Sequence, residues 1–183
     1  MKIKILFIAG FIFFTTCFCN AQAYLGWITK TVNFRTEPSK TGAVISNLKA
    51  GTQIFIISSV SENDFYNIID INTNEEGYVH KSFIRFGDPV EKNEGGLFSP
   101  NGMSSSYDPE LAIYNNTNKT LTLKLNATRY TFYPHERKTI ALSAGYYNYI
   151  ASAPGVMPNI GTETVQSNTK YSWEFYIQTK YGY

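Results

Sequence analysis

The chain of 183 residues contains only two cysteines and two histidines. Both cysteines, Cys17 and Cys19, lie in an N-terminal segment that we expect to be removed, so the rest of the chain has no thiol. That excludes disulfides, a cysteine nucleophile and cysteine-based metal sites. His80 and His135 are far apart in the sequence, and neither has the spacing of a metal site or of a nucleophile–histidine–acid triad. We therefore expect no catalytic residue, no metal and no cofactor.

Other sequence elements of enzymes are missing too. There is no Gly-x-Ser-x-Gly motif and no glycine-rich phosphate loop. The adjacent acids Glu75 and Glu76 belong to the turn-like stretch 72–77, where a solvated pair is the ordinary interpretation. Asn-x-Thr sequons are interpreted as turn asparagines and strand threonines rather than glycan acceptors; they begin at Asn115, Asn118 and Asn126. The protein is expected to bind rather than to catalyse.

Neither sign of charge is in large excess. The chain has 16 lysines and arginines against 14 aspartates and glutamates, a net charge of +2. Lys2 and Lys4 account for the whole excess, so the chain without its N-terminal segment is neutral. Because polyanion binding needs a basic surface, we expect no nucleic-acid partner.

The N-terminus has the pattern of a secretory signal peptide. Two lysines precede the apolar run 5–14, and the small residues Ala21 and Ala23 form a cleavage site. The run is too short to span a bilayer, so we expect residues 1–23 to be a signal peptide and the mature chain to have no transmembrane segment. Cleavage before Gln22 is the alternative. We expect the mature protein in the periplasm, on the cell surface or secreted.

A lipoprotein signal is the less favoured interpretation of the same segment. It requires a small residue directly before the cysteine that is acylated. Thr16 precedes Cys17 and Phe18 precedes Cys19, so neither cysteine fits.

Residues 24–87 have no helical period. Short alternating apolar runs are separated by Gly, Asn, Ser and Asp, which predicts about five strands in a small β-barrel or sandwich. In one of them Val32 and Phe34 share one face, and Pro38 ends the strand because proline cannot continue a sheet ladder. A 3₁₀ turn is expected over residues 80–84.

The order of motifs in this part resembles a bacterial SH3-like domain. An opening strand, a strand with an Arg-x-x-Pro loop, a Leu-Lys-x-Gly turn, an aromatic-x-x-aliphatic strand and a Gly-aromatic-Val strand follow one another. The motifs are Gly26-Trp27-Ile28, Val32-Asn33-Phe34-Arg35 with Pro38, Leu48-Lys49-Ala50-Gly51, Phe65-Tyr66-Asn67-Ile68, Gly77-Tyr78-Val79 and Ser82-Phe83-Ile84. Phe34 replaces the usual smaller aliphatic residue and Tyr78 the usual tryptophan. The resemblance implies a small β-barrel over 24–87.

Residues 88–109 are rich in Gly, Pro and Ser and are predicted to be a flexible linker. Leu97, Phe98 and Met103 are candidates for fixing part of it to a neighbouring domain. From 110 to 183 the alternation returns, with Leu121, Leu123 and Leu125 on one face of a strand, and predicts a small antiparallel β-sandwich. The segment 140–155 is weakly similar to PEGA-like or transthyretin-like β-domains. The chain is thus expected to be all-β.

The rich aromatic content divides into core and surface candidates. Core positions are expected for Phe34, Phe65, Trp173 and Phe175. In the SH3-like family, the loop after Arg35 and the turn 72–77 can wall a groove for cell-wall peptide, glycan or a protein segment. The resemblance implies ligand contacts for Arg35, Glu37, Tyr66 and Tyr78, against the alternatives of a loop-bracing arginine and of tyrosines that pack on the barrel.

We therefore expect an exported, non-catalytic binding protein of the bacterial envelope, with a cell-wall component or an envelope protein as partner. The alternative is an assembly or inhibitor protein that acts through the C-terminal sandwich, by strand addition or by an aromatic face. That face is expected at Tyr146, Tyr147 and Tyr149, or at the C-terminal 181–183. The sequence gives no oligomeric state.

Overall fold

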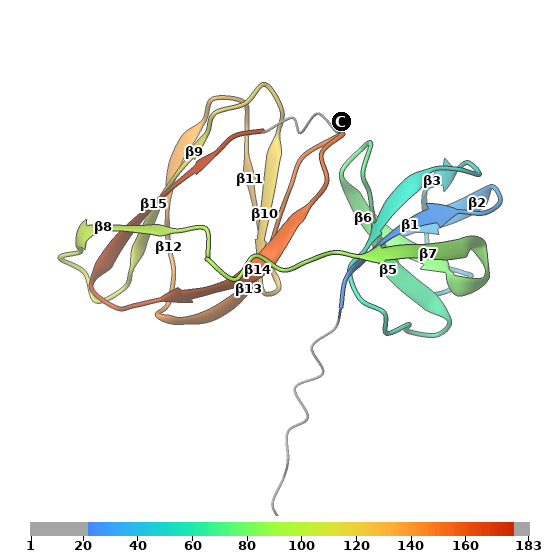
Figure 1. The fold of residues 1–183 in the computed structure, drawn as a ribbon, viewed down its shortest axis with the longest axis horizontal. Helices are drawn as coiled ribbons and strands as arrows, with labels where there is room; N and C mark the ends of the chain where they lie inside the picture. Colours follow the sequence, from blue (N-terminus) through green and yellow to red (C-terminus); the bar gives the residue numbers. More distant parts are fainter. Residues whose placement is uncertain (1–21, 178–183) are drawn as a thin grey trace, which may run out of the picture.

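In the computed structural model, which describes residues 22–177, the chain folds into fifteen β-strands and one 3₁₀ turn. Figure 1 shows a barrel formed by the blue-to-green part of the chain beside a sandwich formed by the yellow-to-red part. The all-β prediction is confirmed. The expected signal peptide, apart from Gln22 and Ala23, and the tyrosines of 181–183 lie outside the described residues.

The barrel is a single strongly bent sheet with the strand order β3-β2-β6-β5-β4-β1-β7. Phe34, Ile54, Ile68 and Val79 are fully buried in its core. The 3₁₀ turn lies within the range predicted for it. The elements are β1 (Tyr24–Ile28), β2 (Val32–Arg35), β3 (Val44–Leu48), β4 (Gln53–Ile56), β5 (Phe65–Asp70), β6 (Glu75–His80), η1 (Lys81–Phe83) and β7 (Ile84–Pro89).

The close approach of β2 and β6 depends on Gly77. A Cβ atom at this position would lie 2.5 Å from the Arg35 carbonyl oxygen and 2.7 Å from the Phe34 ring. Only glycine lets the two backbones approach so closely. The crossing pairs Arg35 with Tyr78 and so positions the first residues of the long loop 36–43.

The C-terminal part is a sandwich of two four-stranded sheets, ordered β11-β10-β13-β14 and β12-β9-β15-β8. Leu111, Ile113, Leu121, Leu123 and Phe132 are fully buried between the sheets. Most neighbours are antiparallel, but β9 and β15 pair in parallel. The strands are β8 (Ser99–Met103), β9 (Glu110–Asn115), β10 (Leu121–Leu125), β11 (Thr128–Phe132), β12 (Arg137–Ala141), β13 (Gly145–Ser152), β14 (Asn159–Val165) and β15 (Thr169–Phe175).

Residues 88–109, expected to be a flexible linker, are partly built into the sandwich. Residues 99–103 form β8, an edge strand paired with β15. Phe98 is buried in the sandwich core, and the Glu163 carboxylate accepts the backbone N–H groups of Leu97 and Phe98 at 2.6 and 2.9 Å. Met103, in contrast, is 84% exposed. One buried ring and one carboxylate therefore fix a segment whose composition is typical of a linker.

The barrel and the sandwich share an interface that the sequence did not indicate. Phe55, Ile69 and Ile71 of the barrel form one buried cluster with Ile160 of β14. Polar contacts border it: Asn74 donates to the Thr122 hydroxyl at 3.1 Å, and Lys124 pairs with Glu76 at 2.6 Å. The turn 72–77 was expected to wall a ligand groove. It instead packs against β10, where Asn74 is buried beside Thr122.

Candidate functional site

The long loop after β2 and the 3₁₀ turn border a groove of about 520 Å³ on the barrel, here called the barrel groove. Val32, Phe65 and Phe83 supply its apolar surface. Its polar and charged lining comes from the stretch 31–47 and from residues 80–82, which are distant in sequence. The remaining lining residues are Thr31, Asn33, Arg35, Lys40, Asn47, His80 and Ser82.

His80 is held rigidly at the edge of this groove. His80 is the N-cap of η1: its Nδ1 accepts the backbone N–H of Ser82 at 3.3 Å, and it also lies 2.8 Å from the Ser82 hydroxyl. The ring packs edge-to-face against Phe65, with 5.2 Å between the ring centroids. Because Nδ1 accepts a hydrogen bond, the neutral ring carries its proton on Nε2. This leaves one fixed N–H donor on the other side of the ring.

The charges that line the barrel groove are all basic. Arg35 and Lys40 are among the lining residues, and none of the described lining residues is acidic. Arg35 also donates to the Gly42 carbonyl at 2.6 Å, so it braces the loop 36–43 from within the groove. An anion such as a carboxylate would meet two cations and the His80 N–H donor here.

Next to the groove, but not among its lining residues, Lys81 and Asp64 form an ion pair. Lys81 lies 2.7 Å from the Asp64 carboxylate, and both side chains are exposed. The hydrogen bond with Lys81 lowers the pKa of Asp64, and the same bond raises the pKa of Lys81. Lys81 is thus the main partner of Asp64, and the groove residues His80 and Lys40 add smaller contributions to the lowered pKa of this carboxyl group.

Of the four residues implied by the family resemblance, only Arg35 lines the barrel groove. Glu37 is exposed in the loop. Tyr66 packs edge-to-face on Phe86, with 5.1 Å between the ring centroids. Tyr78 is half-buried opposite Arg35, and burial, with Glu62 and Glu76 nearby, raises the pKa of its hydroxyl. The positions of Tyr66 and Tyr78 thus favour the alternative in which these tyrosines pack on the barrel.

Lys40, His80 and Phe83 line the groove, but sequence reasoning assigned none of them to ligand binding. Lys40 follows β2, whereas His80 precedes η1 and Phe83 ends it, about forty residues further along the chain. Only the pairing of β2 with β6 brings them together. No local pattern in the sequence would have identified them.

The three tyrosines expected to form a partner face do not share one surface. Tyr146 is 60% exposed, whereas Tyr149 is 1% exposed in the sandwich core. Burial raises the pKa of Tyr149 to about 12, and its hydroxyl donates to the Asn159 side chain at 3.2 Å. Tyr147 is half-buried and donates to the Ser143 carbonyl. Alternation along β13 places Tyr146 on the opposite face of the strand from Tyr147 and Tyr149.

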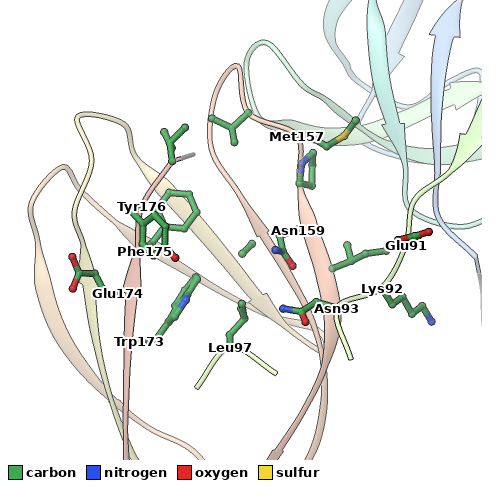
Figure 2. A pocket seen from close by; sticks show the side chains of 15 residues that line it. Glu91, Lys92, Asn93, Leu97, Met157, Asn159, Trp173, Glu174, Phe175 and Tyr176 are labelled. Atoms are coloured by element: carbon green, nitrogen blue, oxygen red, sulfur yellow. The ribbon is translucent and has the colours of Figure 1, made fainter. Parts of the chain in front are cut away.

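A second hollow, of about 830 Å³, opens on the sandwich and is here called the sheet-gap groove. Figure 2 shows Trp173, Glu174 and Tyr176 on one side of it, with Glu91 and Asn159 across the gap. Trp173, expected in the core, is only partly buried because it lines this groove. Sequence reasoning placed Trp173 and Phe175 on one face but did not foresee the opening beside them.

In residues 22–177, no three His, Cys, Asp or Glu side chains gather closely enough to hold a metal ion. In the same range, no helix has the length and apolar character that crossing a membrane requires.

Comparison with known proteins identifies one part of the chain. The family model of the bacterial SH3 domain matches residues 30–85. These residues include the whole lining of the barrel groove. No curated protein and no solved structure matches the chain.

Proposed function

Residues 30–85 form a bacterial SH3 domain, a binding module, and from this premise we propose that the barrel groove recognises a carboxylate-bearing peptide of the bacterial cell wall. The protein would act as an exported, non-catalytic binding protein. The signal-peptide pattern of residues 1–23 supports export. The absence of cysteine after residue 23 and the wide separation of the two histidines in the sequence support a non-catalytic role.

The observation that carries the proposal is the one-signed charge of the groove. Arg35 and Lys40 flank an apolar surface of Val32, Phe65 and Phe83 without an acidic lining residue. An extended peptide with free carboxylates suits such a groove, because its backbone and apolar side chains cover the rings while its carboxylates meet the cations. Cell-wall stem peptides have this chemistry. A neutral glycan chain would leave both cations without a partner.

Retention on purified cell-wall sacculi tests the proposal. The mature chain should sediment with sacculi, and retention should fall as salt rises because the cations are partly exposed. Lys40→Glu should reduce the fraction retained about tenfold, since it replaces an attraction by a repulsion at the groove. Lys49→Glu is the matched control, because Lys49 is an exposed lysine of the same domain that does not line the groove.

The proposal fails if the mature chain is not retained, or if both lysine variants are retained as well as the parent. Retention that survives removal of the stem peptides by an amidase would direct attention to glycan instead. It would overturn the assignment of a peptide ligand.

A further inference from the structure

The edge of β15 is open where it borders the sheet-gap groove. β15 pairs with β9 from Lys170 to Phe175, but with β8 only from Thr169 to Ser172. Within residues 22–177, no strand pairs with residues 173–175 on the β8 side. β15 ends at Phe175, and the stretch from Trp173 to Ile177, which includes two residues beyond the strand, spans about 13 Å at roughly 3.3 Å per residue.

The path of the segment before β8 explains the gap. Asn93 donates its N–H to the Ile160 carbonyl at 2.7 Å and bridges to Gly161, so this segment covers the edge of β14. The chain then crosses to the other sheet, where Ser99 joins β15 opposite Ser172. The sheet-gap groove lies between the two sheets next to this crossing, and Figure 2 shows Leu97 at its base.

On the β8 side of β15, no strand among residues 22–177 pairs with the backbone beyond Ser172. The Phe175 carbonyl accepts the Asn116 N–H on the β9 side. Because successive residues of a strand alternate in direction, the N–H and C=O groups of Glu174 point to the opposite, open side. A strand laid there could bond to Glu174 and continue the line of β8, and it would reach Tyr176 by extending β15 past Phe175.

The other outer edges of the sandwich are protected. Proline, exposed cations and a covering segment are the usual means of preventing strand addition. β8 contains Pro100, β11 carries Arg129, β12 carries Arg137 and Lys138, and Asn93 covers β14. The open part of β15 has none of these, and Trp173 beside it is half-buried.

Charge and lining indicate what kind of strand fits. Apolar lining comes from Leu97, Val156 and Trp173, while Glu91 and Glu174 stand on opposite sides of the gap against the single cation Lys92. A segment with apolar side chains on one face and lysines on the other suits this groove. Its apolar side chains would pack on the apolar lining, and its lysines would pair with the two glutamates.

We propose that the sheet-gap groove accepts an extended, lysine-bearing apolar segment of a partner protein, which adds as a strand to β15 beside Glu174–Tyr176. The site is separate from the barrel groove and does not depend on the ligand proposed there.

A synthetic peptide, Lys-Phe-Lys-Val-Lys-Phe with blocked ends, tests the proposal against the mature full chain by calorimetry and amide hydrogen exchange. Binding should slow exchange at the Glu174 and Tyr176 amides. The peptide with Glu in place of Lys should bind about tenfold more weakly, and the lysine peptide N-methylated at alternate amides should lose about tenfold as well. The first change reverses the charge, and the second removes the backbone donors.

Two variants of the chain provide a matched pair. Glu91→Lys should weaken binding of the lysine peptide about fivefold, because Glu91 lines the groove and is exposed. Glu94→Lys should leave it unchanged, since Glu94 is exposed in the same segment but does not line the groove.

Several outcomes would overturn the proposal. Equal affinity for the N-methylated peptide excludes strand addition, and absence of heat and of slowed exchange at millimolar peptide excludes the site. If the Glu174 and Tyr176 amides are already protected without peptide, the occupant is part of this protein itself. Sedimentation then distinguishes a second copy, in a dimer, from the chain's own continuation after Ile177, in a monomer.

Discussion

Single residues of the same type have different roles here, as the three sequon asparagines show. Asn126 has a positive φ of 52°, so it supplies turn geometry as expected. Asn115 is fully buried instead, and its Nδ2 lies 2.8, 3.1 and 2.9 Å from the carbonyl oxygens of Lys119, Phe132 and Tyr133. A glycan on Asn115 is incompatible with this folded environment.

Replacing Asn115 by alanine should lower the free energy of unfolding by about 2–3 kcal/mol, because buried carbonyl groups lose their donor. Urea denaturation followed by tryptophan fluorescence measures the change. Asn118→Ala is the control: Asn118 is exposed and bonded only to His135, so about 0.5 kcal/mol or less is expected. Equal effects of the two variants would contradict the structural role assigned to Asn115.

At the scale of elements, alternation identified strands with one buried face and missed those without one. β10 has Leu121, Leu123 and Leu125 buried, and its pattern was recognised. β8 has the sequence Ser-Pro-Asn-Gly-Met and no buried residue. Such a strand exists only because β15 offers it a hydrogen-bonding edge, and nothing in its own composition predicts it.

Glu163 is expected to control the segment that leads into β8. Glu163→Ala removes two charge-assisted hydrogen bonds to the Leu97 and Phe98 N–H groups. Exchange of these two amides should accelerate about tenfold, which corresponds to roughly 1.4 kcal/mol of local stability. Hydrogen exchange followed by NMR measures it, and Glu94→Ala, at an exposed residue of the same segment, should change neither rate. Unaltered exchange in the Glu163 variant would show that Phe98 alone fixes the segment.

At the scale of the whole molecule, the polar border of the domain interface carries a dependence on pH. Burial opposes ionisation of Glu76, but hydrogen bonds from Lys124 and Asn67 outweigh it and lower the pKa of this carboxyl group. A lowered pKa in the folded state stabilises the protein above the ordinary glutamate pKa. That contribution is lost as the pH falls through the lowered folded-state value.

Glu76→Gln should therefore reduce stability at pH 7 by about 1–2 kcal/mol and flatten its decline on acidification. Urea midpoints at pH 7 and at about pH 3 measure both effects, since ordinary glutamates titrate near pH 4.3. Glu75→Gln, at the exposed neighbour, should behave like the parent. An identical decline in parent and Glu76→Gln would show that this ion pair does not contribute.

The sequence by itself determined the all-β class and the strands that have one buried face. Alternation of apolar residues is a local property, and it predicted the burial of Phe34, Phe65 and Phe175 because each side of a strand faces one environment. The same reasoning, with the ordered motifs, led to the SH3-like barrel that the family model confirms for residues 30–85.

Only the tertiary structure decided where the two grooves lie. The barrel groove joins Arg35 to His80 through a strand pairing, and the interface turns Asn74 away from solvent through contact with Thr122. The open edge of β15 depends on where a distant segment crosses between sheets. Each of these results from contacts between residues far apart in the chain, and spacing along a sequence does not specify such contacts.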